Sequence, residues 1–178
     1  MVDVLMPYAE TDAGSAAPIS ARIGDLTGRV VGIVNNSWRC MDLITDELRT
    51  ALRSDYSVAD VTEIKISATQ TLPDDELIRL SETCDAVIVG IGTCGSCSRW
   101  VLQDAIELER RGVPSVAVFT KVFEQLARAV RSHEGMPDLE LAVLPHPLNS
   151  LPDEQIRAIA AGAVGAIVGA LTEVRVPA

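Results

Sequence analysis

Short apolar runs with few charges alternate along this chain with longer segments in which apolar residues recur every three or four positions. Runs of the first kind are typical of strands buried on both faces of a parallel sheet, and segments of the second kind are typical of amphipathic helices. Strands are predicted at residues 29–35, 58–67, 85–91, 114–120 and 139–144. Helices are predicted at residues 41–53, from about 73, at 100–111, at 123–131, and from about 153 through 171.

This alternation predicts an α/β fold. Strands that are each followed by a helix run parallel and are joined by right-handed crossovers, with helices on both faces of the sheet. Hydrophobic residues make up 48% of the 178 residues and aromatic residues only 3%, so the core is expected to consist of Val, Ile, Leu and Ala. We predict a flavodoxin-like, doubly wound, parallel five-stranded sheet with strand order 2-1-3-4-5.

Residues 1–25 lack a sustained periodicity and are predicted to form an extended N-terminal arm before a single α/β domain at residues 26–178. The first residues contain no basic region followed by an apolar core, as a secretory signal would, and the apolar residues 158–172 are too few to span a bilayer. We therefore expect a cytoplasmic protein with no membrane partner. The net charge of −10, without a basic patch, argues against nucleic acid as a partner.

Two of the predicted helices carry signals at their ends. Thr71 with Asp74, and Ser150 with Asp153, match the capping-box pattern, in which a hydroxyl precedes a carboxylate by three residues.

The last helix has glycines at 162, 165 and 169 among alanines. We expect this small-residue face to be buried against the sheet, and a homodimer through the face is the alternative.

In a sheet of this order, ligands bind beyond the carboxyl ends of the first and third strands, where the strand order reverses. Residues 93–98, Thr-Cys-Gly-Ser-Cys-Ser, follow the third strand and open the next helix. A thiolate at Cys94 would face unpaired N–H groups there, which lowers a cysteine pKa from about 8.5 toward ~3.5–7.5. Cys97 is placed to resolve a mixed disulfide or a sulfenic acid on Cys94.

Side chains from other strand ends complete the candidate site. His146 follows the fifth strand and is a candidate acid or base beside Cys94 and Cys97. The alternative is an exposed loop residue, because the fifth strand would lie two strands, about 10 Å, from the third. Lys121 follows the fourth strand and could stabilise a thiolate or bind a substrate carboxylate. The predicted substrate-binding residues are Asn35, Asn36, Thr93, Ser96 and Lys121.

Other interpretations of the cysteine segment have less support. Residues 90–95 match G-x-G-x-x-G but follow the third strand, so dinucleotide binding is not predicted. Only four residues separate Cys94 from Arg99, one fewer than a Cys-x5-Arg phosphatase loop requires. Cys40 and Cys84 form no second close pair, so no metal site is predicted. Small buried core cysteines are the remaining alternative.

The segment Cys94-Gly95-Ser96-Cys97 resembles the signature of the UGSC-like family, some members of which carry selenocysteine at the position of Cys94. The resemblance extends from about Leu26 through residues 35–38 to residues 144–147 and the final helix. An exchange of selenocysteine and cysteine in similar proteins implies a nucleophilic or redox role at this position.

Three functions remain open from the sequence. The first is a thiol-dependent oxidoreductase that uses Cys94 and Cys97 on a small-molecule substrate, with no cofactor beyond an external thiol reductant. The second is a non-redox lyase, isomerase or addition and cyclisation enzyme, in which the Cys94 thiolate acts as nucleophile or base with His146. The third is a non-catalytic binding or assembly subunit that joins a second copy or a partner protein.

Overall fold

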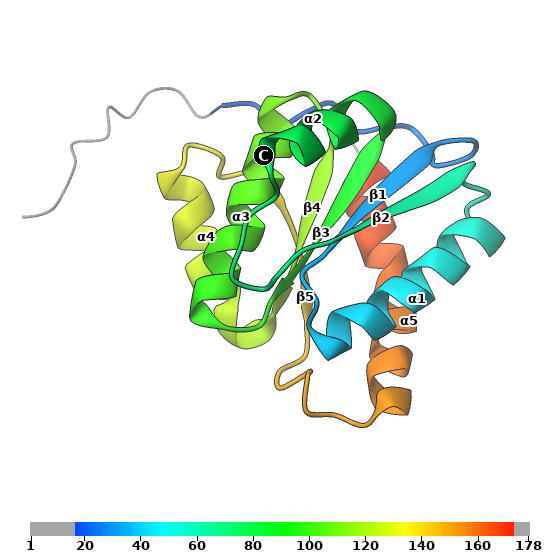
Figure 1. The fold of residues 1–178 in the computed structure, drawn as a ribbon, viewed down its shortest axis with the longest axis vertical. Helices are drawn as coiled ribbons and strands as arrows, with labels where there is room; N and C mark the ends of the chain where they lie inside the picture. Colours follow the sequence, from blue (N-terminus) through cyan, green and yellow to red (C-terminus); the bar gives the residue numbers. More distant parts are fainter. Residues whose placement is uncertain (1–16, 173–178) are drawn as a thin grey trace, which may run out of the picture.

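The computed structural model describes residues 17–172 and contains one sheet of five parallel strands (Figure 1). The strands are β1 (Val30–Asn35), β2 (Asp60–Lys65), β3 (Ala86–Gly92), β4 (Ser115–Thr120) and β5 (Glu140–Leu144). The helices are α1 (Arg39–Ser54), α2 (Asp74–Thr83), α3 (Gly95–Arg110), α4 (Glu124–His133) and α5 (Asp153–Thr172), with a 3-10 turn, η1 (Lys121–Phe123), before α4. The order β2-β1-β3-β4-β5 confirms the predicted flavodoxin-like fold.

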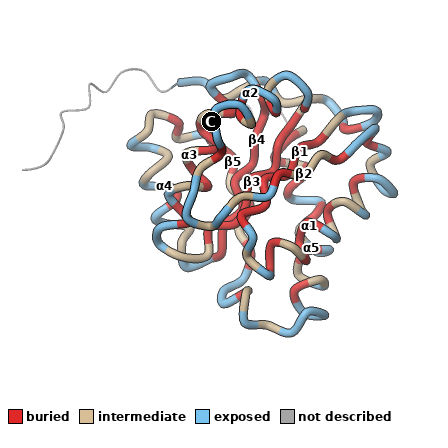
Figure 2. The backbone as a smooth tube through the Cα atoms, viewed as in Figure 1, coloured by how far each residue is buried: buried red, intermediate tan, exposed pale blue. Residues whose placement is uncertain are grey.

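Helices cover both faces of the sheet. Figure 1 shows α1 and α5 together on one side, with α2, α3 and α4 on the other. Successive residues of a strand point to opposite faces, so Ile88 packs in the cluster with α1 and α5, while Val87 and Val89 pack against α3. The central strands are buried along their length (Figure 2). Burial on both faces explains why these strands read as continuous apolar runs.

Helix α5 buries most of its large residues and exposes two of its glycines. Ile156, Ile167 and Leu171 are fully buried in the cluster with α1. By length and composition α5 could cross a membrane, and no other helix in residues 17–172 meets that test. Gly162 and Gly165 are exposed, and a Cβ added at either would meet no atom within 4 Å. The expectation that the glycine face is buried against the sheet is therefore wrong.

Helix α2 begins near the predicted position but without the predicted cap. Its N-cap residue is Pro73, and no side chain caps it. Thr71 lies two positions too early to accept the N–H groups of the first turn, so the capping-box prediction is wrong for this helix. The acidic residues of the first turn still suit the positive end of the helix.

The segment before β1 is tied to the body of the protein. Residues 17–25 contain no helix or strand, and residues 1–16, the larger part of the predicted arm, lie outside the described part of the chain. Ser20 and Arg22 contact Glu109 near the end of α3, and the Ile23 N–H donates to the Leu171 carbonyl. Residues 17–25 therefore connect helices that lie on opposite faces of the sheet.

Candidate functional site

Cys94 and Cys97 form the first turn of α3. Cys94 is the N-cap residue, and its sulfur accepts the Cys97 N–H at 3.2 Å. The Cys97 sulfur accepts the Cys94 N–H at 2.9 Å, so the two cysteines make the reciprocal contacts of a capping box. Two N–H groups at the positive end of the helix thus point at sulfur, an arrangement that favours a thiolate in the reduced form.

The two cysteines are close enough to bond but differ in exposure. Their Cα atoms lie 5.5 Å apart and their sulfur atoms are joined in a disulfide. Cys97 is 0% exposed, whereas Cys94 is half-buried, which confirms the predicted difference in exposure. The Ser96 hydroxyl lies 3.6 Å from the Cys94 sulfur. Cys94 is therefore the more accessible cysteine of the pair.

The glycines that precede Cys94 are required by packing. A Cβ at Gly90 would lie 2.8 Å from the Met41 sulfur, and a Cβ at Gly92 would collide with the Phe119 ring. Gly95 has open space around it. The first two glycines of the G-x-G-x-x-G pattern are thus explained by the close approach of β3 to its neighbours, whereas Gly95 is not.

Asn36 holds the end of β3 in place. Its side-chain Nδ2 donates to the Ile91 carbonyl at 3.0 Å, and its Oδ1 accepts the Ile91 N–H at 2.8 Å. Asn36 is 3% exposed, and both ends of its amide are engaged by this one residue. The ladder between β3 and β4 shifts register in the same stretch, between Val89 and Gly92. Asn36 therefore positions the strand end that carries Cys94.

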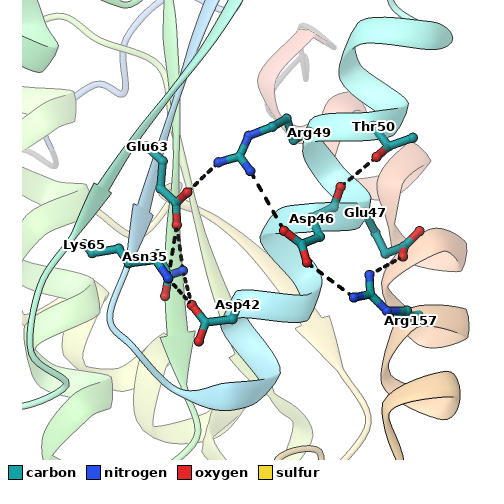
Figure 3. Close-up of polar contacts among 9 residues, drawn as sticks. All are labelled: Asn35, Asp42, Asp46, Glu47, Arg49, Thr50, Glu63, Lys65 and Arg157. Carbon is teal, nitrogen blue, oxygen red and sulfur yellow. Dashed lines mark hydrogen bonds and ion pairs between the residues drawn. The ribbon is translucent and has the colours of Figure 1, made fainter.

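Asn35 belongs to a polar network at the outer edge of the sheet (Figure 3). Its Nδ2 donates to Asp42 at 2.9 Å and to Glu63 at 2.8 Å, and its Oδ1 accepts the Ser37 N–H at 2.9 Å. Lys65 donates to the same Asp42 oxygen at 2.6 Å, a bond that raises the pKa of Lys65 and lowers the pKa of Asp42. The Asn35 amide is engaged within the protein, so its predicted contact with substrate stays a prediction.

His146 is connected to the end of β3 through Thr120. The His146 Nδ1 lies 3.0 Å from the Thr120 hydroxyl, which donates to the Gly92 carbonyl at 3.4 Å. When the single hydroxyl proton of Thr120 is directed at the Gly92 carbonyl, Nδ1 is the donor to Thr120 and Nε2 carries the lone pair. The His146 ring also meets the Phe123 ring edge-on, with centroids 5.9 Å apart. His146 thus lies on the same rim as Cys94, although no hydrogen bond joins the two within residues 17–172.

The remaining predicted residues are less closely connected. Lys121 is 71% exposed and pairs with Glu124 in the following helix. Thr93 is half-buried between β3 and Cys94. Cys40 and Cys84 are buried in the core, where burial raises the pKa of the Cys40 thiol to about 11. No group of three or more His, Cys, Asp or Glu side chains is placed to hold a metal within the described residues.

Two contacts of this site lie outside the sequence-based prediction. Thr120 is 0% exposed and links three strand ends, and the Ser98 hydroxyl donates to the Cys94 carbonyl at 2.6 Å. Thr120 ends β4 directly before Lys121. The prediction named the exposed Lys121 because of its charge and did not include Thr120. A hydroxyl at the end of a buried parallel strand was the available signal.

The fold and the site define a flavodoxin-like α/β protein with a Cys-x-x-Cys pair at the point where the strand order reverses. The chain matches the UGSC family over residues 3–173 and belongs to that family. None of the curated proteins matches it. Among solved structures it is similar to a mutant of the flavo di-iron protein from Thermotoga maritima, at 13% identity and a TM-score of 0.42. That match covers 81% of this chain and 36% of the other, so the chain spans about a third of that protein.

Proposed function

We propose that this protein is a thiol-dependent oxidoreductase in which Cys94 and Cys97 act on a small-molecule substrate. The observation that carries the proposal is the arrangement of a reachable N-cap cysteine with a second, fully buried cysteine behind it. Their Cα separation of 5.5 Å lies in the range that disulfides accept, about 4.4–6.8 Å. The pair can therefore alternate between dithiol and disulfide without a large movement of the backbone.

The reaction begins with the reduced pair and an oxidised substrate such as a small disulfide. The Cys94 thiolate attacks one substrate sulfur, a mixed disulfide forms, and the other substrate sulfur leaves and takes a proton. The Cys97 thiolate then attacks the Cys94 sulfur, and the second substrate sulfur leaves with a proton. Two electrons and two protons pass from the protein to the substrate, and an external thiol returns the pair to the dithiol form.

A second candidate function uses Cys94 without a change in its oxidation state. The contact of His146 with Thr120 favours it, because it leaves the Nε2 of an exposed imidazole free to accept a proton on the rim that holds Cys94. In this alternative the Cys94 thiolate adds to a carbonyl or an activated alkene, or moves a proton, and Cys97 only supports the turn.

Two single variants separate these functions. The probe is bis(2-hydroxyethyl) disulfide with glutathione as reductant, and the readouts are steady-state turnover and intact mass. For the oxidoreductase, a pre-reduced Cys97→Ser protein given the probe without glutathione is expected to stop at a mixed disulfide on Cys94 and to release one mercaptoethanol, whereas the parent releases two. Mild oxidation of the parent protein is expected to remove about 2 Da, the two hydrogens of an internal disulfide.

Cys94→Ser is expected to lose almost all activity under either function, because an alcohol does not supply a thiolate near neutral pH. A Cys97→Ser variant that forms no mixed disulfide with the probe, together with a parent that never loses the two hydrogens, would reject the oxidoreductase. The same two results, with an addition reaction found for the parent, would support the second candidate. An ordinary thiol pKa at Cys94, with no turnover of any probe, would favour a binding or assembly subunit.

A further inference from the structure

A hollow lined by Trp100 of α3 has no part in the chemistry described so far. It has a volume of about 580 Å³ and lies between the loop after β2 and the second turn of α3. Small-molecule sites in proteins have volumes of about 300–1,000 Å³, so this hollow is large enough for a substrate. Its lining includes Lys65, Ser67, Thr69, Gln70, Thr71 and Trp100.

Trp100, which lines the hollow, lies on the same face of α3 as Ser96, which contacts Cys94. Trp100 lines the hollow, and Ser96, one helical turn earlier, has its hydroxyl 3.6 Å from the Cys94 sulfur. Residues four apart lie on the same side of a helix and about 6 Å apart along its axis. On the opposite wall, the Ser37 hydroxyl donates to the Ile66 carbonyl at 2.8 Å, which joins the wall to the turn after β1. A ligand in the hollow therefore lies within one or two helical turns of the reactive sulfur.

The loop between β2 and α2, which forms one wall of the hollow, is held in place by a hydrogen bond to α3. The Leu72 N–H donates at 3.0 Å to Asp104, a buried carboxyl on α3. Asp104 lies one helical turn beyond Trp100, so the same helix supplies the aromatic wall and the anchor for the loop. The two sides of the hollow are thus held at a set distance from each other.

The charges around the hollow disfavour an anion. The Lys65 ammonium contacts Asp42 at 2.6 Å and Glu63 at 4.0 Å, so two carboxylates already neutralise it. The first turn of α2, directly after the loop, carries Asp74, Asp75 and Glu76. An anionic ligand would be repelled by these carboxylates, while an uncharged one would meet hydroxyl and amide groups.

We propose that this hollow binds the non-reacting part of the substrate, and that this part is an uncharged, flat heteroaromatic ring with hydrogen-bonding groups. Trp100 offers a half-exposed indole on which such a ring can stack, and Ser67, Thr69 and Gln70 offer donors and acceptors around it. The inference rests on the proposed function, because a ligand held there is presented to Cys94.

Two matched pairs of heteroaromatic probes, each with an uncharged and an anionic member, test whether the hollow binds such a ring and whether it rejects a negative charge. Nicotinamide is compared with nicotinate, and adenosine with AMP, by ligand-detected NMR titration. The titration uses the parent protein and a Cys94→Ser variant, in which binding is separated from thiol chemistry. At least one uncharged probe is expected to bind 10-fold or more tightly than its anionic counterpart, in both proteins.

Variants locate the binding in the hollow. Trp100→Ala is expected to weaken the uncharged probe at least 10-fold, and Gln70→Ala, a change on the exposed loop, about 3-fold. Arg99→Ala is the matched control, since Arg99 precedes Trp100 on the helix but pairs with Glu134 outside the hollow, and it should leave affinity unchanged. Equal losses in Trp100→Ala and Arg99→Ala would overturn the location.

The inference fails if neither uncharged probe binds, or if the anions bind as tightly as the uncharged molecules. Its failure is distinguishable from failure of the proposed function. A protein that turns over disulfides but binds no uncharged ring retains the oxidoreductase function and loses this site. A Cys94→Ser variant that binds the ring, in a parent that shows no redox turnover, retains the site and loses the oxidoreductase.

Discussion

At the scale of single residues, the capping box of α3 joins structure to chemistry. Capping boxes are usually built from a hydroxyl and a carboxylate or amide, and here two sulfur atoms take both positions. The Cys97 N–H, which the Cys94 sulfur accepts at the helix end, is the same group that would stabilise a Cys94 thiolate. The Ser98 hydroxyl stabilises the same turn by donating to the Cys94 carbonyl. The helix start therefore holds the nucleophile in position.

This geometry predicts a large difference in thiol reactivity. After reduction, iodoacetamide near pH 6.5 is expected to modify Cys94 at least 10-fold faster than Cys97, because Cys94 is half-buried and Cys97 is 0% exposed. Cys40 and Cys84 serve as internal controls, since burial raises the pKa of both thiols and should keep them unmodified. Peptide mass spectrometry over time measures the four rates. Faster labelling of Cys97 would reverse the roles of the two cysteines.

The cysteine pair could be predicted from the sequence, whereas its supports could not. The close spacing of Cys94 and Cys97 after a buried strand is a local pattern, and local patterns are visible in a single sequence. The contacts of Asn36 with Ile91 and of Thr120 with His146 join residues 55 and 26 positions apart. Such pairings depend on how the strands align, which periodicity alone does not specify.

At the scale of elements, Asp104 connects α3 to the loop that precedes α2. It is 2% exposed and accepts one N–H, from Leu72. Burial raises the pKa of the Asp104 carboxyl to about 7, with the Leu72 hydrogen bond acting in the opposite direction. The folded protein therefore keeps a proton that the unfolded chain releases near pH 4, so the free energy of unfolding falls as pH rises between about 4 and about 7.

Replacing Asp104 with Asn should remove this pH dependence. Between pH 5 and pH 8 the parent is expected to lose roughly 2–3 kcal/mol more of its free energy of unfolding than Asp104→Asn. The amide oxygen of the variant can still accept the Leu72 N–H, so the hydrogen bond serves as its own control. Urea unfolding at both pH values measures the difference. Parallel pH profiles for the two proteins would show that Asp104 does not hold the proton.

Helix α5 shows where a sequence pattern can point to the wrong face. Its predicted inward stripe of large residues, which includes Ile156, Ile167 and Leu171, is buried as expected. Gly162 and Gly165 fall on the opposite face of the same helix and are exposed. Alanines occur on both the buried and the exposed face of α5, so the sequence does not mark clearly where one face ends and the other begins. The glycines could therefore be assigned to the core in error.

Substituting a large residue on the exposed face should therefore leave the protein folded. Gly165→Leu meets open space and is expected to raise the free energy of unfolding by about 0.5–1 kcal/mol, because leucine is the better helix former. Ala160→Leu is the matched control, since Ala160 is 1% exposed and overpacking there should cost about 1–3 kcal/mol. Circular dichroism during urea unfolding compares the two. A Gly165→Leu protein that fails to fold would show that this face of α5 packs against another part of the protein.

At the scale of the whole molecule, the alternation of strands and helices was sufficient to predict the sheet order. Crossovers between parallel strands are right-handed as a rule, so a chain with this alternation has few ways to arrange five parallel strands, and the observed order is β2-β1-β3-β4-β5. Residues 17–25 have no periodicity, so their position could not be predicted in this way. Their contacts with Glu109 and Leu171 are specific side-chain and backbone pairings across the molecule.

The buried Arg22–Glu109 ion pair joins residues 17–25 to α3, and its removal should destabilise the entire fold. Their side chains are 4% and 0% exposed, so Arg22→Ala would leave a carboxylate in the interior without its cation. Loss of one partner of a buried pair costs about 3–5 kcal/mol, and the Ser20 and Ser115 N–H donors that remain place the expected value near 3 kcal/mol. Arg29→Ala is the matched control, because the Arg29–Asp85 pair is 48% and 31% exposed and should contribute at most about 1 kcal/mol. Urea unfolding of the two variants in parallel provides the measurement, and equal free energies of unfolding would show that the segment is not fastened by this pair.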